Sequence, residues 1–369
     1  MLNISKSDIE LTAAPTIEST DLQFVKHVKP EITYKPDRDV LKYINKHISR
    51  FDVSNIHTAK ERTQLEYLSP SQPYIVNLQR INDVRHLNKF FEKVNEKLEP
   101  GGKFISFVET AYERKHRILK KFPKIISYPY YTCDYILKRV FPKWSVTKRI
   151  YFALTKGRNR VLSVAETLGR LVSCGFEIIE YKEINNHLFF VTRKVKDPSY
   201  DMKPSYGPLI KMRRVGKNGK IIRVYKFRTM HPYAEYLQEY IYNKHKLKKG
   251  GKFENDFRIT TAGRLFRKIW LDEFPMIYNM LKGELKLVGV RPLSLHYFNL
   301  YDEELKEKRG RYKPGLVPPY YADMPHTLDE IIESEKRYLD SYEKSPILTD
   351  IKYFFKAFHN IIFKRARSA

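Results

Sequence analysis

Helical apolar patterns and short apolar runs follow one another along the first two hundred residues, which predicts helices alternating with strands. Residues 39–48 predict a helix, and the apolar runs 74–78 and 103–110 predict strands. Residues 84–98 predict a second helix, with apolar side chains at helical spacing: Leu87, Phe90, Phe91, Val94 and Leu98. Residues 99–102, Glu-Pro-Gly-Gly, predict a stop and a turn. This half of the chain therefore predicts an α/β fold.

A second pattern begins after residues 196–206, which contain two prolines, show no periodicity and predict a linker. Residues 207–230 form two extended runs on either side of Gly216-Lys217-Asn218-Gly219, which predicts a β-hairpin. Alternation along the returning strand puts Lys226 and Arg228 on one face. Two cations on one strand face could bind phosphate, although solvated charges on a strand are common.

Residues 255–270 predict a short helix capped by Thr260 or Thr261. One face of this helix is cationic, and we expect the opposite, apolar face to be buried. The cationic face holds Arg264, Arg267 and Lys268, and the apolar face holds Leu265, Phe266 and Ile269.

Asp272 and Glu273 follow directly, in front of Pro275 and an apolar stripe that predicts another helix. The stripe consists of Ile277, Met280 and Leu281. Acids at a helix start complement the helix dipole, so two adjacent acids have a purely structural explanation. The alternative is a site that handles phosphate and a metal.

The composition bounds the partners and the compartment. The chain has 369 residues, 42% of them apolar, which gives room for two domains. A net charge of +27 favours polyanionic partners: nucleic acid, an anionic membrane or phosphorylated substrates. Two cysteines without metal-type spacing favour a reducing compartment. Residues 1–35 predict an irregular leader that lacks a signal-peptide pattern, and no apolar run predicts a membrane span.

Residues 111–160 combine basic and aromatic side chains, with fourteen Lys/Arg, two acids and ten aromatics. This mixture suits the headgroup layer of an anionic membrane or a single-stranded nucleic acid. The alternative is a solvated basic insertion whose aromatics are buried in its own domain. Residues 351–369 predict an amphipathic helix with apolar residues and Lys/Arg.

The order strand, helix, Leu98-Glu99-Pro100-Gly101-Gly102, strand resembles the later half of a SAM-dependent methyltransferase domain. Residues 164–194 strengthen the resemblance with a helix, a Cys-Gly-Phe turn and a closing hairpin. The resemblance implies a Rossmann-like domain over residues 36–195. The first glycine of the chain is Gly101, so the family's glycine-rich SAM loop is absent. We therefore expect a degenerate domain that binds no SAM, with active methylation as the alternative.

Several motifs in the second half agree in order and spacing. They are YKFRTM (225–230), RITTAGRLFRK (258–268), LDEFP (271–275), LKGELKLVGVRP (281–292) and YKPGL (312–316). Together they resemble the bacterial sugar transferases, the monotopic polyprenyl-phosphate phosphoglycosyl transferases. The resemblance implies an α+β sugar transferase domain over residues 207–369.

The resemblance also implies a chemistry. Asp272 would attack the β-phosphate of a UDP-sugar, release UMP and form a covalent phosphosugar-aspartate, which a polyprenyl (undecaprenyl) phosphate would then accept. Glu273 would bind Mg²⁺. Cations would offset the charge of the diphosphate. The candidates for phosphate binding are Lys226, Arg228, Arg258, Arg264, Arg267 and Arg291, with Pro292 beside the last.

The chain departs from this family just before Gly207, where the re-entrant membrane helix is missing and the methyltransferase-like domain stands in its place. We expect residues 111–160 and 351–369 to bind an anionic membrane instead, as peripheral anchors on the cytoplasmic face of the bacterial inner membrane. Residues 313–327 replace the family's glycine-rich continuation. The sequence therefore does not identify the sugar donor, and it leaves the lipid length, the glycan pathway and the oligomeric state open.

Two other classes of function compete with an enzyme that initiates a surface polysaccharide or lipid-linked glycan. A non-catalytic membrane-associated scaffold has no physical need for adjacent acids beside clustered cations. A nucleic-acid-binding protein would fit the net charge, but the sequence has no RRM, KH or helix-turn-helix signature. We therefore predict a sugar-phosphate transferase.

Overall fold

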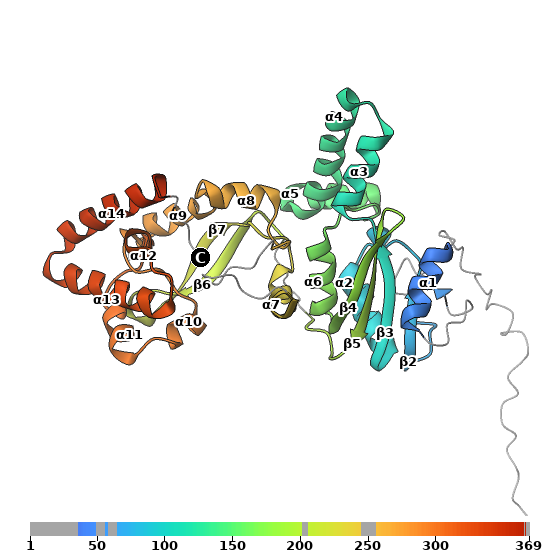
Figure 1. Cartoon of the computed structure of the whole chain (residues 1–369), viewed down its shortest axis with the longest axis horizontal. Helices are drawn as coiled ribbons and strands as arrows, with labels where there is room; N and C mark the ends of the chain where they lie inside the picture. Colours follow the sequence, from blue (N-terminus) through green and yellow to red (C-terminus); the bar gives the residue numbers. More distant parts are fainter. Residues whose placement is uncertain are drawn as a thin grey trace, which may run out of the picture.

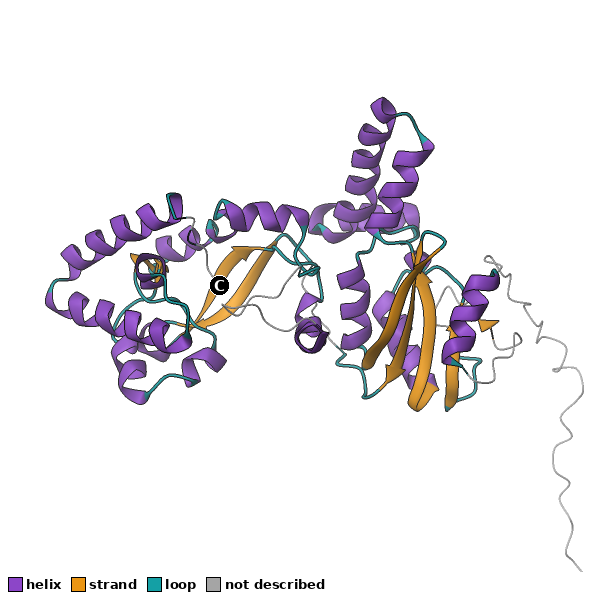
Figure 2. Cartoon of the chain, in the orientation of Figure 1, coloured by secondary structure: helices purple, strands orange, loops and turns teal. Residues whose placement is uncertain are grey.

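The structure is a computed structural model that describes residues 36–48, 56–57, 65–200, 206–244, 256–364 and 366. It is a mixed α/β molecule in which a larger sheet and a smaller hairpin follow one another along the long axis (Figures 1 and 2). The predicted leader, residues 1–35, lies outside the described residues. Among those residues, no helix combines the length and apolar character needed to cross a membrane.

The larger sheet has five strands in the order β1-β2-β3-β5-β4. Their bounds are β1 Ile56–His57, β2 Gln72–Asn77, β3 Leu98–Val108, β4 Phe176–Ile184 and β5 His187–Lys194. β1, β2 and β3 are parallel, whereas β5 runs antiparallel to both β3 and β4. The strands predicted at residues 74–78 and 103–110 and the closing hairpin are confirmed.

The predicted stop is confirmed, because the helix α2, Leu87–Lys97, ends just before it, but the predicted turn at residues 99–102 is wrong, because these residues belong to β3. They are accommodated as an irregularity in the pairing with β2, where the register shifts between Gln72 and Tyr74. Gly101 takes a φ of 80° there, a backbone conformation that favours glycine. The turn-forming residues therefore bend a strand instead of ending it.

Helices cover both faces of this sheet, and each face has its own core. α1 Arg38–His47 packs on one face against Ile105 and Val191, while α2 Leu87–Lys97 and α6 Val164–Ser173 pack on the other against Phe104 and Phe190. The two sets of sheet residues alternate along β3 and β5, as successive side chains of a strand must. The helices predicted at 39–48 and 84–98 are both confirmed.

The basic-aromatic segment forms helices that project from the sheet (Figure 1). α3 Ala111–Lys121 and α4 Lys124–Tyr135 make a helical hairpin, which continues through the π-helical turn Ile136–Val140 into α5 Ser145–Thr155. Thr110 and Glu113 start α3 with a capping box. The exposed large apolar side chains here include Ile125, Ile126, Leu137, Val140 and Trp144. These side chains are not buried within the domain, which removes part of the argument for a merely solvated insertion.

The second half is built from short elements around a hairpin. β6 Leu209–Val215 and β7 Ile221–Phe227 pair antiparallel on either side of the predicted turn, and β8 Lys286–Val288 pairs parallel with β9 Gly315–Val317. The helices are α7 Gln238–Lys244, α8 Thr261–Lys268, α9 Met276–Leu281, α10 Leu295–Asn299, α11 Glu303–Gly310, α12 Pro319–Asp323, α13 Leu328–Lys344 and α14 Pro346–Ile362. The predicted C-terminal amphipathic helix corresponds to α14.

The two halves share a core. Leu237, just before α7, and Ile241, in α7, pack into the same hydrophobic cluster as side chains of α2 and α6. Gly169 of α6 lies so close to Tyr233 that a Cβ at this position would come within 2.2 Å of the Tyr233 carbonyl oxygen. The Arg170 guanidinium lies 4.6 Å from the centre of the Tyr233 ring. The region after the hairpin is therefore part of the N-terminal packing unit.

Candidate active site

Asp272 and Glu273 lie in the single 3-10 turn Leu271–Glu273, between α8 and α9. The chain enters this turn through Trp270, which takes a left-handed φ of 64°. Such a backbone is rare and strained for a large side chain, so the surroundings must hold it. The Trp270 indole donates a hydrogen bond to the Tyr321 hydroxyl at 2.9 Å and stacks edge-on against that ring. The sequence analysis missed Trp270, because no pattern of apolar residues signals a left-handed backbone.

Glu273 is buried and ion-paired with Lys226 of β7. The Lys226 Nζ lies 2.5 Å from Glu273 Oε1, with side-chain exposures of only 16% and 7%. Water screens such a pair little, so a charged partner group in this place acts strongly. The structure thus brings together one predicted acid and one predicted cation.

Asp272 is half-buried and has an unfavourable charge beside it. Burial raises the pKa of Asp272, and the negative charge of Glu273 raises it further. Lys226 and Arg267 act in the opposite direction. The carboxylate is therefore held at higher free energy than in water, as in sites where ionisable groups do chemistry.

Arg267 is positioned by the segment that follows β7. Its Nε donates a hydrogen bond to Thr229 Oγ1 at 3.0 Å. Burial lowers the pKa of Arg267, and the charge of Asp272 partly offsets this effect. The guanidinium is thus fixed within electrostatic range of Asp272.

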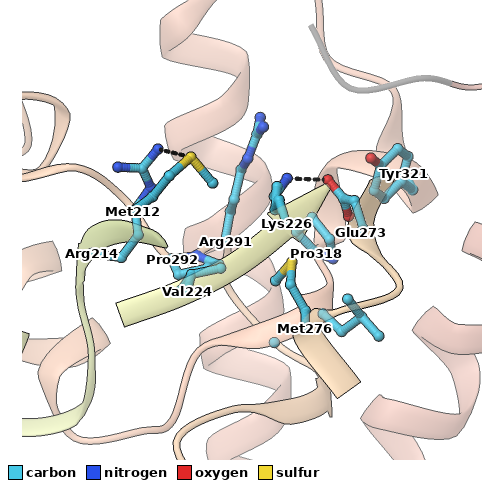
Figure 3. Close-up of a pocket in the computed structure, with 12 residues that line it drawn as sticks. Met212, Arg214, Val224, Lys226, Glu273, Met276, Arg291, Pro292, Pro318 and Tyr321 are labelled. Atoms are coloured by element: carbon cyan, nitrogen blue, oxygen red, sulfur yellow. Dashed lines mark hydrogen bonds and ion pairs between the residues drawn. The ribbon is translucent and has the colours of Figure 1, made fainter. Parts of the chain in front are cut away.

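A small cavity of about 50 Å³ opens beside Glu273 (Figure 3). Its charged lining is Lys226, Glu273, Arg214 and Arg291, and Pro292 lines it as well. The Arg291 carbonyl accepts a hydrogen bond from Arg309 Nη2 at 2.6 Å, which ties down the Arg291-Pro292 loop. Burial lowers the pKa of Arg214, and the charge of Arg291 adds to that effect. Three cations around one acid give the cavity a surplus of positive charge, as an anion site requires.

The sequence analysis missed Arg214, although a signal for it exists. Arg214 pairs with Ile222 across the hairpin, and Met212 pairs with Val224. Opposed residues of an antiparallel pair share one face, and this face also carries Lys226 two residues beyond Val224. Extending the alternation of β7 across to β6 would have predicted Arg214.

Three other predicted cations lie elsewhere. Arg228 follows the end of β7, so strand alternation no longer applies to it, and its Nε donates to the Gly207 carbonyl at 2.9 Å. Arg258 is buried against Asp256, with 2.7 Å between Nη2 and Oδ2. Arg264 is exposed on α8. The structure gathers Lys226, Arg267, Arg291 and Pro292 near the acids and separates these three from them.

The expected buried face of α8 is wrong. Leu265 and Ile269 are 55% and 58% exposed. α8 is packed instead through Gly263, where an added Cβ would come within 2.0 Å of the Thr229 carbonyl oxygen. The small residue lets the helix approach the backbone of Thr229. Leu265 and Ile269 stay exposed, and of the expected face only Phe266 packs, with its ring centre 5.9 Å from that of Phe227. The apolar stripe of α9 is likewise largely exposed at Ile277 and Leu281.

The acid pair has the chemistry of a magnesium site that a substrate completes. Among the described residues, no three His, Cys, Asp or Glu side chains come together as a self-sufficient metal site. Mg²⁺ needs fewer protein ligands, since one or two carboxylates with phosphate oxygens and water suffice. The Lys226 ion pair uses Glu273 Oε1, so Oε2 is the oxygen available to the metal in this arrangement. Burial raises the pKa of Asp272 and the charge of Glu273 raises it further, effects that a cation bound beside the pair would offset.

Comparisons with known proteins agree with the resemblance found for the second half of the chain. Residues 201–364 match the sequence profile of the family described as bacterial sugar transferase. The chain is 36% identical over 152 residues to the galactosyl transferase CpsE of Streptococcus agalactiae, covering 40% of this chain and 33% of that protein. It is 35% identical over 150 residues to the undecaprenyl-phosphate galactose phosphotransferase of Salmonella typhimurium, covering 39% and 31%. It is 34% identical over 116 residues to the UDP-glucose:undecaprenyl-phosphate glucose-1-phosphate transferase of Klebsiella pneumoniae, covering 31% and 23%.

The chain spans a third or less of the length of these three relatives. An O-methyltransferase family protein from Burkholderia thailandensis resembles 37% of this chain and 34% of that protein, with a TM-score of 0.21 and 9% identity. This similarity is too low to assign a fold. The methyltransferase-like interpretation of residues 36–195 stays a prediction.

Proposed function

Residues 201–364 belong to the bacterial sugar transferase family, and on this premise we propose that the chain moves a phosphosugar from a UDP-sugar to a polyprenyl phosphate. The names of two relatives include undecaprenyl phosphate, and one of them also names UDP-glucose. The product would be the first lipid-linked intermediate of a surface polysaccharide or lipid-linked glycan. The observation that carries the proposal is Asp272, a half-buried carboxylate on which Arg267 and Lys226 act electrostatically.

In the first step, a carboxylate oxygen of Asp272 attacks the β-phosphorus of the UDP-sugar. The bond from this phosphorus to the bridging oxygen breaks, and UMP leaves with the electron pair. In the second step, a phosphate oxygen of the polyprenyl phosphate attacks the same phosphorus and releases the Asp272 carboxylate. Dividing one transfer into two displacements lets a single nucleophile serve both substrates.

The cations, together with Mg²⁺ held by Glu273, would offset repulsion between the anionic nucleophile and the anionic diphosphate. Lys226 and Arg267 already lower the pKa of Asp272 against the effects of burial and Glu273, so they keep part of it ionised. Arg291 and Arg214 extend the positive charge along the cavity. Mg²⁺ held by Glu273 would neutralise phosphate charge as it develops.

The test is UMP release from a panel of UDP-sugars with Mg²⁺ and undecaprenyl phosphate. Asp272→Asn should reduce release by several orders of magnitude, because removing a nucleophile removes the chemistry. Asp329→Asn, an exposed aspartate of α13, is the matched control and should release UMP like the wild type. Equal release by wild type and Asp272→Asn would exclude the covalent mechanism, and no release from any donor would favour a scaffold role.

We also propose that the chain binds the cytoplasmic face of the bacterial inner membrane peripherally. α14 buries Tyr353 and Ala357 on one side and exposes a stripe of large apolar residues on the other. The stripe consists of Ile347, Ile351, Phe355, Phe358 and Ile362. α14, α9, α8 and α5 lie along one edge of the molecule, and the α3–α4 hairpin projects from the same edge (Figure 1). Ile125 and Ile126 are exposed near the tip of this hairpin, next to Lys121 and Lys124.

Flotation on anionic liposomes tests the membrane proposal. Two double variants should each reduce the floated fraction severalfold: Ile351→Glu with Phe355→Glu, and Ile125→Glu with Ile126→Glu. Each places charged side chains where apolar ones would enter the apolar layer of the membrane, and burying a charge there is unfavourable. Tyr67→Glu with Val195→Glu changes two exposed apolar residues outside these helices and should float like the wild type. If the wild type stays in the soluble fraction, the proposal fails.

For residues 36–195 we propose a Rossmann-like, methyltransferase-like domain that has no SAM site. The parallel strands β1, β2 and β3 with helices on both faces support the architecture. The absence of any glycine before Gly101 supports the loss of the cofactor loop. Calorimetry with SAM should show no heat of binding, and a measurable heat would overturn this part.

A further inference from the structure

A second and larger cavity, of about 410 Å³, lies between the two halves of the chain. Its lining residues lie in three stretches of the chain, 135–144 of the projecting segment, 206–208 at the start of the second half and 228–232 after β7, together with Thr260 at the start of α8. Most of its lining is apolar or aromatic: Tyr135, Val140, Trp144, Tyr206, Pro208 and Met230. This volume falls in the range of small-molecule sites, roughly 300–1,000 Å³.

The charged side chains in this lining are cations. Arg139 and Lys143 come from the projecting segment, and Arg228 comes from the end of β7. Arg139 and Lys143 both contact Glu166, the buried acid behind the wall. Glu166 is also paired with Arg170, so one negative charge is shared among three cations. With Arg228 added, the cavity has a clear surplus of positive charge.

The remaining ionisable group in the lining is a neutral histidine. Arg139 Nη2 lies 3.0 Å from Nδ1 of His231, which accepts the hydrogen bond as a neutral ring. Burial lowers the pKa of His231 to about 3, and the charge of Arg139 adds to this effect. The cavity therefore offers an apolar body and positive charge, with few polar groups that could recognise a nucleobase.

The cavity is connected to the candidate active site through a short chain of contacts. Arg228 precedes Thr229, whose hydroxyl accepts the hydrogen bond from Arg267. Arg267 in turn acts electrostatically on Asp272. Thr260, the cap of α8, lines the same cavity. Arg228 does not itself contact the acids, but Thr229 and Arg267 connect this end of the cavity to Asp272.

We propose that this cavity binds a lipid phosphate, with the first part of the apolar chain between Trp144, Val140 and Met230 and the phosphate toward Arg228. This inference rests on the proposed function, in which such a lipid is the acceptor. The N-terminal segment that forms half of the cavity would then supply part of the acceptor site. That would give the first half of the chain a direct role in the reaction.

The experiment uses the full chain and farnesyl monophosphate, a short isoprenoid phosphate, below its aggregation concentration. The sequence has two tryptophans, Trp144 and Trp270, so Trp270→Phe leaves Trp144 as the only reporter. Titration should change the Trp144 fluorescence saturably. Farnesol, which lacks the phosphate, should bind at least tenfold more weakly. UDP should not displace the lipid phosphate.

Matched variants test the location. Val140→Glu puts an acid into the apolar wall and should weaken binding at least tenfold. Leu137→Glu is the control, because Leu137 lies in the same π-helical turn, is 47% exposed against 40% for Val140, and is outside the lining. Thermal unfolding of both variants excludes loss of the fold. Equal binding by the two variants, equal binding of farnesol, or displacement by UDP would each overturn the proposal.

UMP release measured on the wild type and on Val140→Glu, both with Trp270 intact, separates this proposal from the proposed function. One outcome is that the wild type binds the lipid phosphate, Val140→Glu does not, and the wild type releases no UMP from any donor. This result would keep the cavity assignment and exclude the transferase. UMP release that Val140→Glu leaves unchanged would remove the cavity assignment and keep the transferase.

Discussion

At the scale of single residues, Asp272 is held where its protonated form is favoured. Burial and the neighbouring Glu273 raise its pKa. A raised carboxyl pKa means that the folded state binds a proton more tightly than the unfolded state. Its contribution to stability is therefore present at low pH and is lost as the pH rises through the folded pKa. At neutral pH the ionised Asp272 costs stability, which is a common signature of a functional residue.

Asp272→Asn should therefore increase the free energy of unfolding at pH 7 while removing activity. Asp256→Asn is the opposing control, because its pairing with Arg258 overcomes burial and lowers the pKa of Asp256. That variant should be less stable than the wild type at pH 7. Urea unfolding of both variants at pH 7 measures the difference. A destabilised Asp272→Asn would contradict the account of the site.

Activity should follow the same ionisation. The nucleophile must be deprotonated, so kcat/KM for UMP release should fall on the acid side at a pH above the ordinary pKa of an aspartate. Removing the charge of Glu273 removes one cause of that shift. The residual activity of Glu273→Gln should therefore fall at a lower pH than that of the wild type. An unchanged acid limb would mean that another group controls it.

At the scale of elements, the sequence predicted most helices and strands and failed where packing overrides local pattern. Periodicity found α1, α2, α14 and the β6–β7 hairpin, because in each case one face is buried against a neighbour. It could not place Arg228, since alternation ends with the strand. It misassigned most of the buried face of α8, because Gly263 and Phe266 pack this helix whereas Leu265 and Ile269 are exposed. Left-handed Trp270 carries no periodic signal at all.

The close approach of α8 to Thr229 gives a test at this scale. Gly263→Ala would place a Cβ within 2.0 Å of the Thr229 carbonyl oxygen, which belongs to the backbone and cannot move aside easily. We expect a loss of about 2 kcal/mol or more in the free energy of unfolding. UMP release should also fall, because Thr229 positions Arg267.

Gly310→Ala is the matched control for that variant. Gly310 ends α11, and a Cβ added there meets no atom within 4 Å. This variant should be neutral or up to about 1 kcal/mol more stable, since alanine restricts the unfolded chain. Equal effects of the two substitutions in chemical denaturation would show that the close approach is unimportant.

At the scale of the whole molecule, a buried charge cluster joins the two halves. Glu166 of α6 binds Arg139 at 2.6 Å and Arg170 at 2.9 Å, and it also contacts Lys143. Burial opposes the ionisation of Glu166, but these cations hold its pKa well below the usual range. Arg139 reaches His231 in the second half. The cluster is stable only when all its members are present.

Glu166→Gln should therefore destabilise the chain by about 3–5 kcal/mol, because it leaves buried cations without their partner. Glu177→Gln breaks an ion pair with Arg193 that is about half exposed and should change stability by less than about 1 kcal/mol. Chemical denaturation at pH 7 compares the two. A small effect at Glu166 would mean that the cluster is solvated in solution.

Acid should weaken the same junction. A lowered carboxyl pKa gives stability that is lost as the pH falls, and a histidine held neutral must stay uncharged in the folded state. In the folded state the pKa of His231 is about 3, so its ring stays neutral at mildly acidic pH. In the unfolded chain the histidine takes up a proton once the pH falls below its ordinary pKa of 6.5, and this protonation favours unfolding. The free energy of unfolding should fall steadily from pH 6.5 downward. His231→Gln should flatten this dependence.

The packing of Leu237 and Ile241 among α2 and α6 has a consequence for how this chain arose and how it can be cut. A gene fusion that only tethers two parts leaves each with a complete interior. Here the interior of the first part is finished by side chains encoded after the junction at residue 207. A fragment ending at the linker would keep a hole the size of two aliphatic side chains, whereas one ending after Lys244 would fill it. The point at which the match to the sugar transferase family begins is therefore not the point at which folding divides.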